Sequence, residues 1–220
     1  MERSSNIDTE YENEMKAKGF NLVIGVDEAG RGPLAGPVVA AAVALKNDQF
    51  QSSIADSKKL SSKQREEAFD EIYKNAYVGL GVISESVIDR GNILDATFLA
   101  MTNAVENLII QFCVDVGRDR GFHHDICLLI DGNLFRAELP YTYRTIIRGD
   151  QSVLSIACAS IIAKVTRDRI LNVYDQVFPE YGFKQHKGYP TLQHKRAIAT
   201  HGLSLIHRRT FKSSLPLGKS

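Results

Sequence analysis

The sequence has little cysteine, and its cysteines follow no regular pattern. The 220 residues contain three, Cys113, Cys127 and Cys158, each among apolar neighbours. An odd and irregular set argues against a disulfide framework, so we expect buried free thiols. A zinc site at His123, His124 and Cys127 is also disfavoured, because no second pair of ligands stands at zinc-binding spacing.

The sequence also lacks a long apolar run. The longest, residues 33–45, has thirteen residues and includes two prolines, whereas a membrane-spanning helix needs about twenty apolar residues. Residues 1–20 are polar and mixed in charge, without the basic start and apolar centre of a secretory signal. We therefore expect a cytoplasmic protein with no membrane association.

Acidic residues are absent from residues 181–220, which hold eight Lys or Arg and four His, although the net charge of the whole chain is only +1. The same segment contains the aromatic residues Tyr181, Phe183, Tyr189 and Phe211. Basic residues mixed with aromatic ones suit a nucleic-acid backbone. A solvated tail is the alternative, but we favour a nucleic-acid contact.

The length and composition indicate one globular domain. Apolar residues make up 44% and charged residues 24% of the chain, which is typical of globular proteins, and 220 residues fit a single domain. We find no internal repeat and no dividing linker. We expect a loose N-terminal extension at residues 1–20, a main domain at 21–180, and a basic C-terminal helical segment at 181–220 packed on that domain.

Strand and helix patterns alternate along the chain, which predicts an α/β fold with a mixed β-sheet flanked by helices. Short apolar runs predict strands at residues 22–26, 38–45, 77–83, 126–130 and 143–147. Helical spacing and capping residues predict helices at residues 9–18, 62–76, 93–108, 152–177 and 190–200. A glycine-rich turn between the first two strands predicts a hairpin.

Acidic residues stand at the ends of three predicted strands. Asp27 and Glu28 follow the first strand, Asp131 follows the strand at 126–130, and Asp150 comes shortly after the strand at 143–147. Because the ends of neighbouring strands lie together, we expect these acids to converge. Successive side chains on a strand point to opposite faces, so we also expect the first strand to end at the acids, with Glu28 reaching the site from the following turn.

Four converging carboxylates would raise one another's pKa unless a cation lay among them. Their oxygen ligands, without His or Cys, favour Mg²⁺ or Mn²⁺ over zinc. Such ions also bind the phosphate of a substrate, so the acids and the basic segment together predict a nuclease. A dinucleotide site at Gly30, Arg31, Gly32 and Gly36 is disfavoured, because a strand-like run follows where that motif needs a helix.

Ordered motifs cover residues 23–211: VIGVDEAGRGPLAGPVV at 23–39, DSKKLS at 56–61, LLIDGN at 128–133, RGD at 148–150, ASIIAKVTRDR at 159–169, HKGYPT at 186–191 and IHRRTF at 206–211. Together these motifs resemble the ribonuclease HII family, the type 2 ribonucleases H of bacteria and archaea. The resemblance implies a ribonuclease H-like fold. It also implies an endonuclease that hydrolyses the RNA strand of RNA/DNA hybrids and cuts on the 5′ side of ribonucleotides embedded in duplex DNA.

By this resemblance, the catalytic and metal-binding acids are Asp27, Glu28, Asp131 and Asp150. Asp168 competes for the fourth position, but it lies inside a predicted helix between two arginines, where a structural ion pair is the better interpretation. We expect two Mg²⁺ or Mn²⁺ ions about 4 Å apart, one activating water and one stabilising the departing 3′-oxygen. The products would carry 5′-phosphate and 3′-hydroxyl ends.

The resemblance also implies substrate contacts. Gly30, Arg31 and Gly32 would contact the ribonucleotide, because glycine lets a backbone approach a 2′-hydroxyl closely. Tyr189 would pack against the neighbouring deoxyribose, or else anchor the C-terminal segment as a half-buried aromatic. Phosphate contacts are expected from four basic residues, Lys58, Lys59, Lys187 and Arg208.

Several alternatives stay open. Ser160 and Lys164, one helical turn apart, either face the substrate or pack their helix, and we leave them out of the predicted site. A protein that binds RNA/DNA junctions without cutting them would need the basic segment but not the four acids. A junction resolvase would share the acids but would not need a turn or a tyrosine that recognises ribose. We expect a monomer, and the sequence indicates no protein partner.

Overall fold

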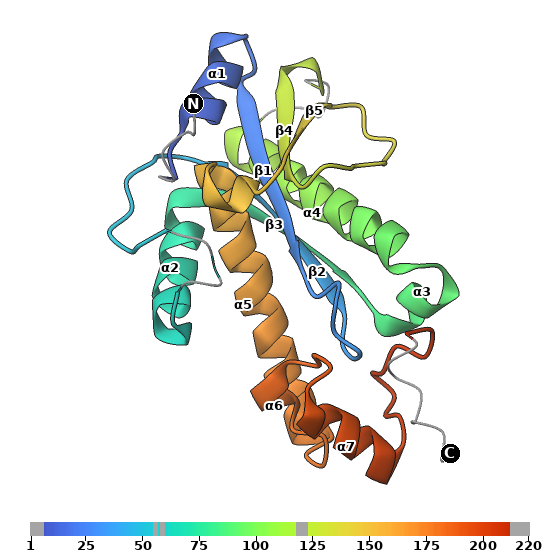
Figure 1. Cartoon of the computed structure of the whole chain (residues 1–220). Coiled ribbons are helices and arrows are strands. Elements are labelled where there is room, and N and C mark those ends of the chain that lie inside the picture. Colours follow the sequence, from blue (N-terminus) through green and yellow to red (C-terminus); the bar gives the residue numbers. More distant parts are fainter. Residues whose placement is uncertain (1–6, 55–56, 58–59, 118–122, 212–220) are drawn as a thin grey trace.

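The computed structural model of the chain describes residues 7–54, 57, 60–117 and 123–211. Its sheet has the strand order β3-β2-β1-β4-β5 (Figure 1). The strands are β1 (Leu22–Ala29), β2 (Val38–Leu45), β3 (Ala76–Ile83), β4 (Ile126–Asp131) and β5 (Thr142–Ile146). β1, β2 and β3 pair antiparallel, whereas β4 and β5 run parallel to β1. The mixed sheet and the antiparallel start of the fold are as the sequence predicts.

The helices are α1 (Glu10–Ala17), α2 (Ser62–Asn75), α3 (Glu85–Arg90), α4 (Ile93–Val116), α5 (Leu154–Val177), α6 (Phe183–His186) and α7 (Leu192–His201). Two short 3₁₀ turns, η1 (His123–Asp125) and η2 (Gly149–Gln151), precede β4 and α5. α3 and α6 were not expected, and α4 is two turns longer than its predicted range. The capping box of Ser61 and Gln64 at the start of α2 is present.

Helices cover both faces of the sheet. α4 lies on one face, while α5 lies on the other with α2 beside it (Figure 1). Alternate residues of β1 serve the two cores: Leu22, Ile24 and Val26 pack on the α4 side, and Val23 on the α5 side. The first half of α5 is buried and rich in small residues, which lets this helix lie close to β1. The three cysteines are buried free thiols, as predicted.

α4 is long and apolar enough, by length and composition alone, to cross a membrane. However, it packs along β3, β2 and β1, and half of its most apolar stretch is buried inside the fold. Helices at the core of globular domains have the same composition, so we assign α4 to the core.

The N-terminal segment is packed, so the expectation of a loose extension is wrong for residues 7–20. The backbone of Asp8 accepts a hydrogen bond of 2.9 Å from the N–H of Leu154 and donates one to the carbonyl of Ser152. Glu12 is 3% exposed and accepts a hydrogen bond of 2.7 Å from the N–H of Ser155. α1 therefore braces the chain where α5 begins.

The C-terminal segment forms a small core of its own against the end of α5. Tyr181 and Phe183 are buried there with Leu171 and Ile198. These two aromatic residues therefore cannot contact nucleic acid, contrary to the interpretation of the basic segment. Three of its four histidines, His186, His194 and His207, are buried as well.

Candidate active site

The first two acids lie on β1 at the point where the strand loses one neighbour. The parallel pairing of β1 with β4 ends at Val26 and Ile130, but its antiparallel pairing with β2 continues to Ala29. The expectation that β1 ends at the acids is therefore wrong. Asp27 and Glu28 still line one cavity, because no β4 residue is paired beside them and the edge of β1 is open there.

Asp131 is the last residue of β4 and lies one residue beyond the last β1–β4 pair, Val26 with Ile130, close enough for its charge to act on Asp27. Asp150 is not at the end of a strand as predicted. β5 ends at Ile146, and Asp150 lies in η2, the short turn that leads into α5. Asp131 accepts a hydrogen bond of 2.7 Å from the N–H of Gly149, which fixes this turn beside β4.

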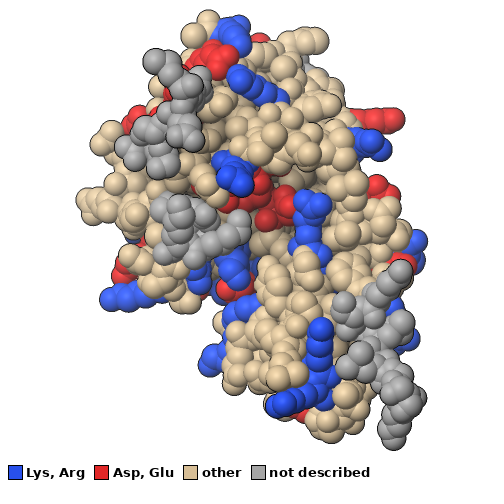
Figure 2. Space-filling view, viewed as in Figure 1, with Lys and Arg blue, Asp and Glu red and all other residues tan. Residues whose placement is uncertain are grey.

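All four acids line a single cavity of about 250 Å³. Figure 2 shows acidic side chains gathered near the centre of this face, with basic side chains beside them. The cavity is lined by Asp27, Glu28, Ala29, Gly30, Arg31, Gly32, Ser57, Asp131, Asp150, Ser160, Lys164 and Tyr189. Eight of the twelve predicted site residues are thus brought together from four separate segments of the chain.

The electrostatics of the cavity are those of buried carboxylates. Burial, followed by the charges of Glu28 and Asp131, raises the pKa of Asp27 well above its usual value, against a hydrogen bond from Ser160. Burial also raises the pKa of Glu28, against the opposing effect of Arg31, whose guanidinium lies 3.3 Å from its Oε1. A cation among these groups would favour their ionised forms.

The donor set fits a hard divalent cation, because all four candidate ligands are carboxylates. Within the part of the chain that the structure describes, however, no three Asp, Glu, His or Cys side chains form a group that could hold a metal ion as it stands. Mg²⁺ does not require such a group, because it is commonly held by one or two carboxylates together with substrate phosphates and water. The residues therefore fit such an ion without a closed protein cage.

Asp150 rather than Asp168 lines the cavity. Asp168 lies on α5 and accepts a hydrogen bond of 2.7 Å from Lys164, so its ion pair is with that lysine and not with the flanking arginines. Lys164 and Ser160 both line the cavity, although we left them out of the predicted site. Their spacing of one helical turn was the signal that placed both on one face of α5.

Ser57 is a further residue that sequence reasoning missed. It lines the cavity, and its hydroxyl lies 3.0 Å from the hydroxyl of Ser160. Ser57 stands beside two lysines in the motif DSKKLS, and no local pattern distinguishes this serine from a surface residue. Those lysines, Lys58 and Lys59, lie outside the described residues.

The turn after β1 contains two glycines in different situations. Gly30 has φ +100°, and a Cβ there would lie 2.2 Å from Nε of Arg167. Gly32 has no left-handed φ, and the nearest atom to a Cβ there would be Cε1 of Tyr189, at an ordinary contact distance of 3.7 Å. Gly30 is therefore required by the fold, whereas the fold has room for a side chain at Gly32. β2 follows this turn, which rules out the dinucleotide motif.

Tyr189 is 43% exposed at the edge of the cavity. Its backbone carbonyl lies 3.0 Å from Nδ1 of His194, and this contact holds the backbone of Tyr189 in place. The tyrosine ring borders Gly32 and is open to solvent, so it does not serve as a buried anchor of the C-terminal segment.

Two of the basic residues predicted to contact phosphate do not lie where that role would place them. Arg208 is 0% exposed and donates all its hydrogen bonds to backbone carbonyl groups, so the expectation of a phosphate contact is wrong for it. Lys187 is partly buried, does not line the cavity and donates to Asn172.

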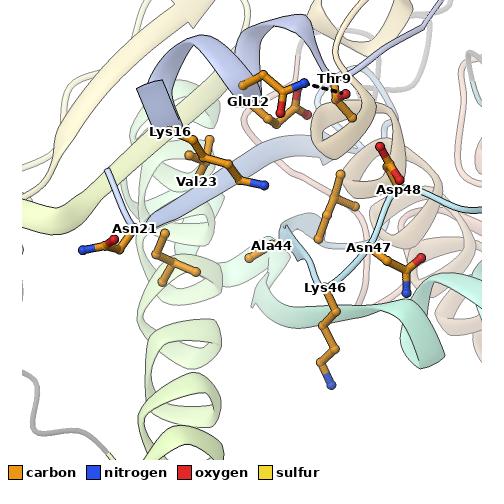
Figure 3. A pocket seen from close by; sticks show the side chains of 12 residues that line it. Thr9, Glu12, Lys16, Asn21, Val23, Ala44, Lys46, Asn47 and Asp48 are labelled. Carbon is orange, nitrogen blue, oxygen red and sulfur yellow. Dashed lines mark hydrogen bonds between the residues drawn. The ribbon is translucent and has the colours of Figure 1, made fainter. Parts of the chain in front are cut away.

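A second cavity, of about 230 Å³, lies at the opposite end of β1, between α1 and the residues that follow β2 (Figure 3). Glu12, Lys16, Lys46 and Asp48 are among its lining residues, so its charges are mixed in sign. None of the predicted site residues lines it.

The chain is similar to known proteins over most of its length. The family model described as ribonuclease HII matches residues 24–214. Ribonuclease HII of Syntrophus aciditrophicus is 47% identical over 92% of this chain and 89% of its own length, and that of Magnetococcus marinus is 48% identical over 89% and 86%.

A solved structure supports the same assignment. The crystal structure of ribonuclease H2 from Pyrococcus horikoshii OT3 is 25% identical with a TM-score of 0.63, and the match covers 88% of this chain and 95% of that one. The fold is therefore that of these ribonucleases. Since the family model spans the cavity and every predicted acid, the chain belongs to the ribonuclease HII family of metal-dependent ribonuclease H hydrolases, which act on RNA/DNA hybrids.

Proposed function

We propose that this chain cuts duplex DNA on the 5′ side of an embedded ribonucleotide, in addition to the RNA strand of RNA/DNA hybrids, and leaves 5′-phosphate and 3′-hydroxyl ends. The observation that supports this most directly is the composition of the cavity. Four carboxylates, a backbone turn with room at Gly32 and the exposed ring of Tyr189 all border one space.

The four acids have the role of metal ligands in this proposal. Asp27, Glu28, Asp131 and Asp150 would hold two divalent ions, Mg²⁺ or Mn²⁺, which supply activation of water and stabilisation of the leaving oxygen. Asp27 and Asp131 each follow the last β1–β4 pair, Val26 with Ile130, and the bond from Gly149 to Asp131 holds the turn of Asp150 beside β4.

The substrate would lie across the turn of residues 30–32 and Tyr189. Gly32 lets the backbone approach the sugar of the ribonucleotide, and Tyr189 would pack on the adjacent deoxyribose. Lys164 lines the same cavity and adds a cation for the backbone phosphate. Lys58, Lys59 and Lys187 remain proposed phosphate contacts, whereas buried Arg208 is withdrawn from that role.

The chain would act as one catalytic unit. Residues 181–220 would form part of the substrate-binding side of the same domain, since the core of Tyr181 and Phe183 packs on α5. A monomer is sufficient, because the cavity is built from one chain. A cytoplasmic location remains a prediction from the sequence.

A duplex of DNA with one internal ribonucleotide tests the proposal. We expect incision at the 5′ side of that ribonucleotide with Mn²⁺ or Mg²⁺, none in EDTA, and none on the all-DNA duplex of the same sequence. Cleavage of the all-DNA duplex would indicate a resolvase-like enzyme. Tight binding in EDTA with no metal-dependent product would indicate a junction-binding protein, and either result overturns the proposal.

A further inference from the structure

Two arginines lie buried beneath the turn of residues 30–37. Arg167, on α5, is 1% exposed, and Arg208, near the C-terminal end of the described chain, is 0% exposed. Burial lowers the pKa of Arg167 to about 10 and that of Arg208 to about 9. Both guanidinium groups therefore stay charged at neutral pH inside the protein, a rare and unfavourable placement unless their donors are well satisfied.

The donors of Arg208 are satisfied by the turn itself. Its guanidinium donates to the carbonyl groups of Gly30 (2.6 Å), Arg31 (3.0 Å) and Gly36 (2.7 and 2.9 Å). One side chain thus holds both ends of the turn. No lysine could do this, because a single ammonium group cannot reproduce the planar fork of a guanidinium.

Arg167 holds the same turn from α5 and joins it to the segment of Tyr189. It donates to the carbonyl groups of Ala35 and Pro37, each at 3.0 Å, and to that of Lys187 at 2.9 Å. The two pieces of backbone that border the cavity are therefore fixed by the same buried side chain.

The bonds from Arg208 to the carbonyl groups of Gly30 and Arg31 set the direction of two N–H groups. In a trans peptide the C=O and the N–H point to opposite sides, so a carbonyl held by Arg208 turns the next N–H away from it. Ala35 shows the rule: its carbonyl accepts from Arg167, and the N–H of Gly36 points the other way, to the carbonyl of Ile206. By the same rule, the N–H groups of Arg31 and Gly32 point away from Arg208.

Those two N–H groups lie on residues that line the cavity. Among the described residues, neither donates a backbone hydrogen bond outside the regular helices and strands. Two neighbouring N–H donors at the edge of a cavity suit an oxygen acceptor, either the 2′-oxygen of a ribose or an oxygen of a phosphate.

We propose that Arg208 and Arg167 are positioning residues of the substrate-contacting turn, which hold its carbonyl groups inward and so present the N–H groups of Arg31 and Gly32 to the substrate. This inference rests on the function proposed above. Neither arginine lines the cavity, and both would act through the backbone that they hold.

The C-terminal segment that carries Arg208 is fastened to the rest of the fold on both sides. Arg208 donates its own N–H to the carbonyl of Leu34 at 2.8 Å. Just beyond it, Asp89 of α3 accepts hydrogen bonds from the N–H groups of Arg209 (2.8 Å) and Thr210 (3.0 Å). α3 is therefore one of two attachments that keep Arg208 under the turn.

The test is the variant Arg208→Lys, which keeps the charge and loses the fork. Arg90→Lys is the matched control, since Arg90 is exposed on α3 and donates to a single carbonyl of its own helix. For each protein, kcat and KM are measured on the duplex with one ribonucleotide. Binding is measured in EDTA for that duplex and for its all-DNA counterpart.

We expect Arg208→Lys to fold and to lose at least about tenfold in kcat, because a small displacement of the substrate is enough for such a loss. The control should match the wild type. A loss of the preference for the ribonucleotide duplex would identify the 2′-oxygen as the acceptor. Equal weakening of both duplexes would identify a phosphate oxygen, and both results support the inference.

Unchanged kcat, KM and preference in folded Arg208→Lys would overturn the inference, even if the melting temperature fell. If that variant does not fold, Asp89→Ala replaces it, because Asp89 is partly exposed and its loss releases residues 209–210 without opening the core. The same changes are expected at smaller size, and their absence overturns the inference. A wild type that cuts neither duplex overturns the proposed function instead, and the binding measurements still decide the role of Arg208.

Discussion

Oδ1 of Asp131 accepts a hydrogen bond of 2.7 Å from the backbone N–H of Gly149, so the acid at the end of β4 holds the turn that carries the next acid of the site. Asp131 would therefore have two roles, as a ligand for a metal ion and as an acceptor that sets the position of Asp150. Two substitutions separate these roles.

Asp131→Asn keeps an oxygen that can accept from Gly149 but removes the charge, whereas Asp131→Ala removes both. We expect cleavage by either variant to fall at least about a thousandfold. Only Asp131→Ala should also lower the free energy of unfolding, by about 1–3 kcal/mol relative to Asp131→Asn, because the N–H of Gly149 loses its partner. Cleavage assays and urea unfolding check the two effects. Equal stabilities of the two variants would contradict the role of the bond.

Asp27→Asn is expected to abolish cleavage and to stabilise the metal-free protein. The pKa of Asp27 is raised in the fold by burial and by its acidic neighbours. The folded state therefore holds a proton that the unfolded state loses above its own pKa, and in EDTA the free energy of unfolding should fall as pH rises through the folded pKa. Removing this carboxylate should raise stability at neutral pH by roughly 0.5–2 kcal/mol.

Urea unfolding of Asp27→Asn in EDTA, between pH 5 and 8, measures this effect. Asp70→Asn, at an exposed position on α2, is the control and should follow the wild type within about 0.5 kcal/mol. If Asp27→Asn shows the same pH dependence as the wild type, the carboxylate of Asp27 does not destabilise the metal-free protein.

The sheet was predictable because its strands are short apolar runs between turns, and each local pattern was sufficient to place one. The position of Asp150 was not predictable. The local pattern does not show that β5 ends at Ile146 or that Asp150 lies in a separate 3₁₀ turn after it. The path of β1 was predicted wrongly for a similar reason. Alternation along one strand does not show where its pairing with β4 ends, and Asp27 and Glu28 border one cavity just beyond that point.

The burial of Arg208 could not be predicted from the sequence either. Arginine is rarely buried, so a basic segment is expected to lie on the surface of the protein. The carbonyl groups that satisfy Arg208 lie 172 to 178 residues away in the chain. Only the docking of residues 206–208 beside Leu34 and Gly36 brings them together.

Gly30→Ala should lower stability, whereas Gly32→Ala should lower activity without lowering stability. A methyl group at Gly30 would meet Arg167 and the carbonyl of Pro37 at a left-handed φ, so we expect a loss of about 1–3 kcal/mol in the free energy of unfolding. The fold has room at Gly32, so stability should stay within about 0.5 kcal/mol. Cleavage should nevertheless fall at least about tenfold, because the methyl group would occupy the space of the substrate. Normal cleavage by folded Gly32→Ala would argue against substrate contact there.

Glu12→Ala should destabilise the start of α5, although Glu12 lies on α1. Glu12 accepts the N–H of Ser155 in the first turn of this helix, a position normally served by a capping residue next to the helix. We expect a loss of about 1–3 kcal/mol in the free energy of unfolding and reduced cleavage, since the turn of Asp150 lies just before this helix. Glu10→Gln, at an exposed position of α1, is the control. Equal stability of the two variants would show that α1 does not brace the site.

The histidines beneath Tyr189 should make stability depend on pH. Nδ1 of His207 accepts the N–H of Ser204, so its proton lies on Nε2 and faces Nε2 of His194, 3.0 Å away. Nδ1 of His194 then donates to the carbonyl of Tyr189. This chain of bonds requires both imidazoles to be neutral, because a second proton would place two N–H groups against each other.

Burial lowers the pKa of His194 and of His207 to about 4. Between about pH 6.5 and pH 4 the unfolded chain therefore binds protons that the folded chain excludes, so the contribution of each histidine is complete above pH 6.5 and is lost as pH falls through this range. The loss for one histidine is on the order of 3 kcal/mol at pH 4. NMR of the ring protons, with the urea-unfolded chain as reference, should show both rings neutral in the folded protein at pH 5.5. Protonation of either ring at that pH without a fall in stability would contradict the neutral chain of bonds that holds Tyr189.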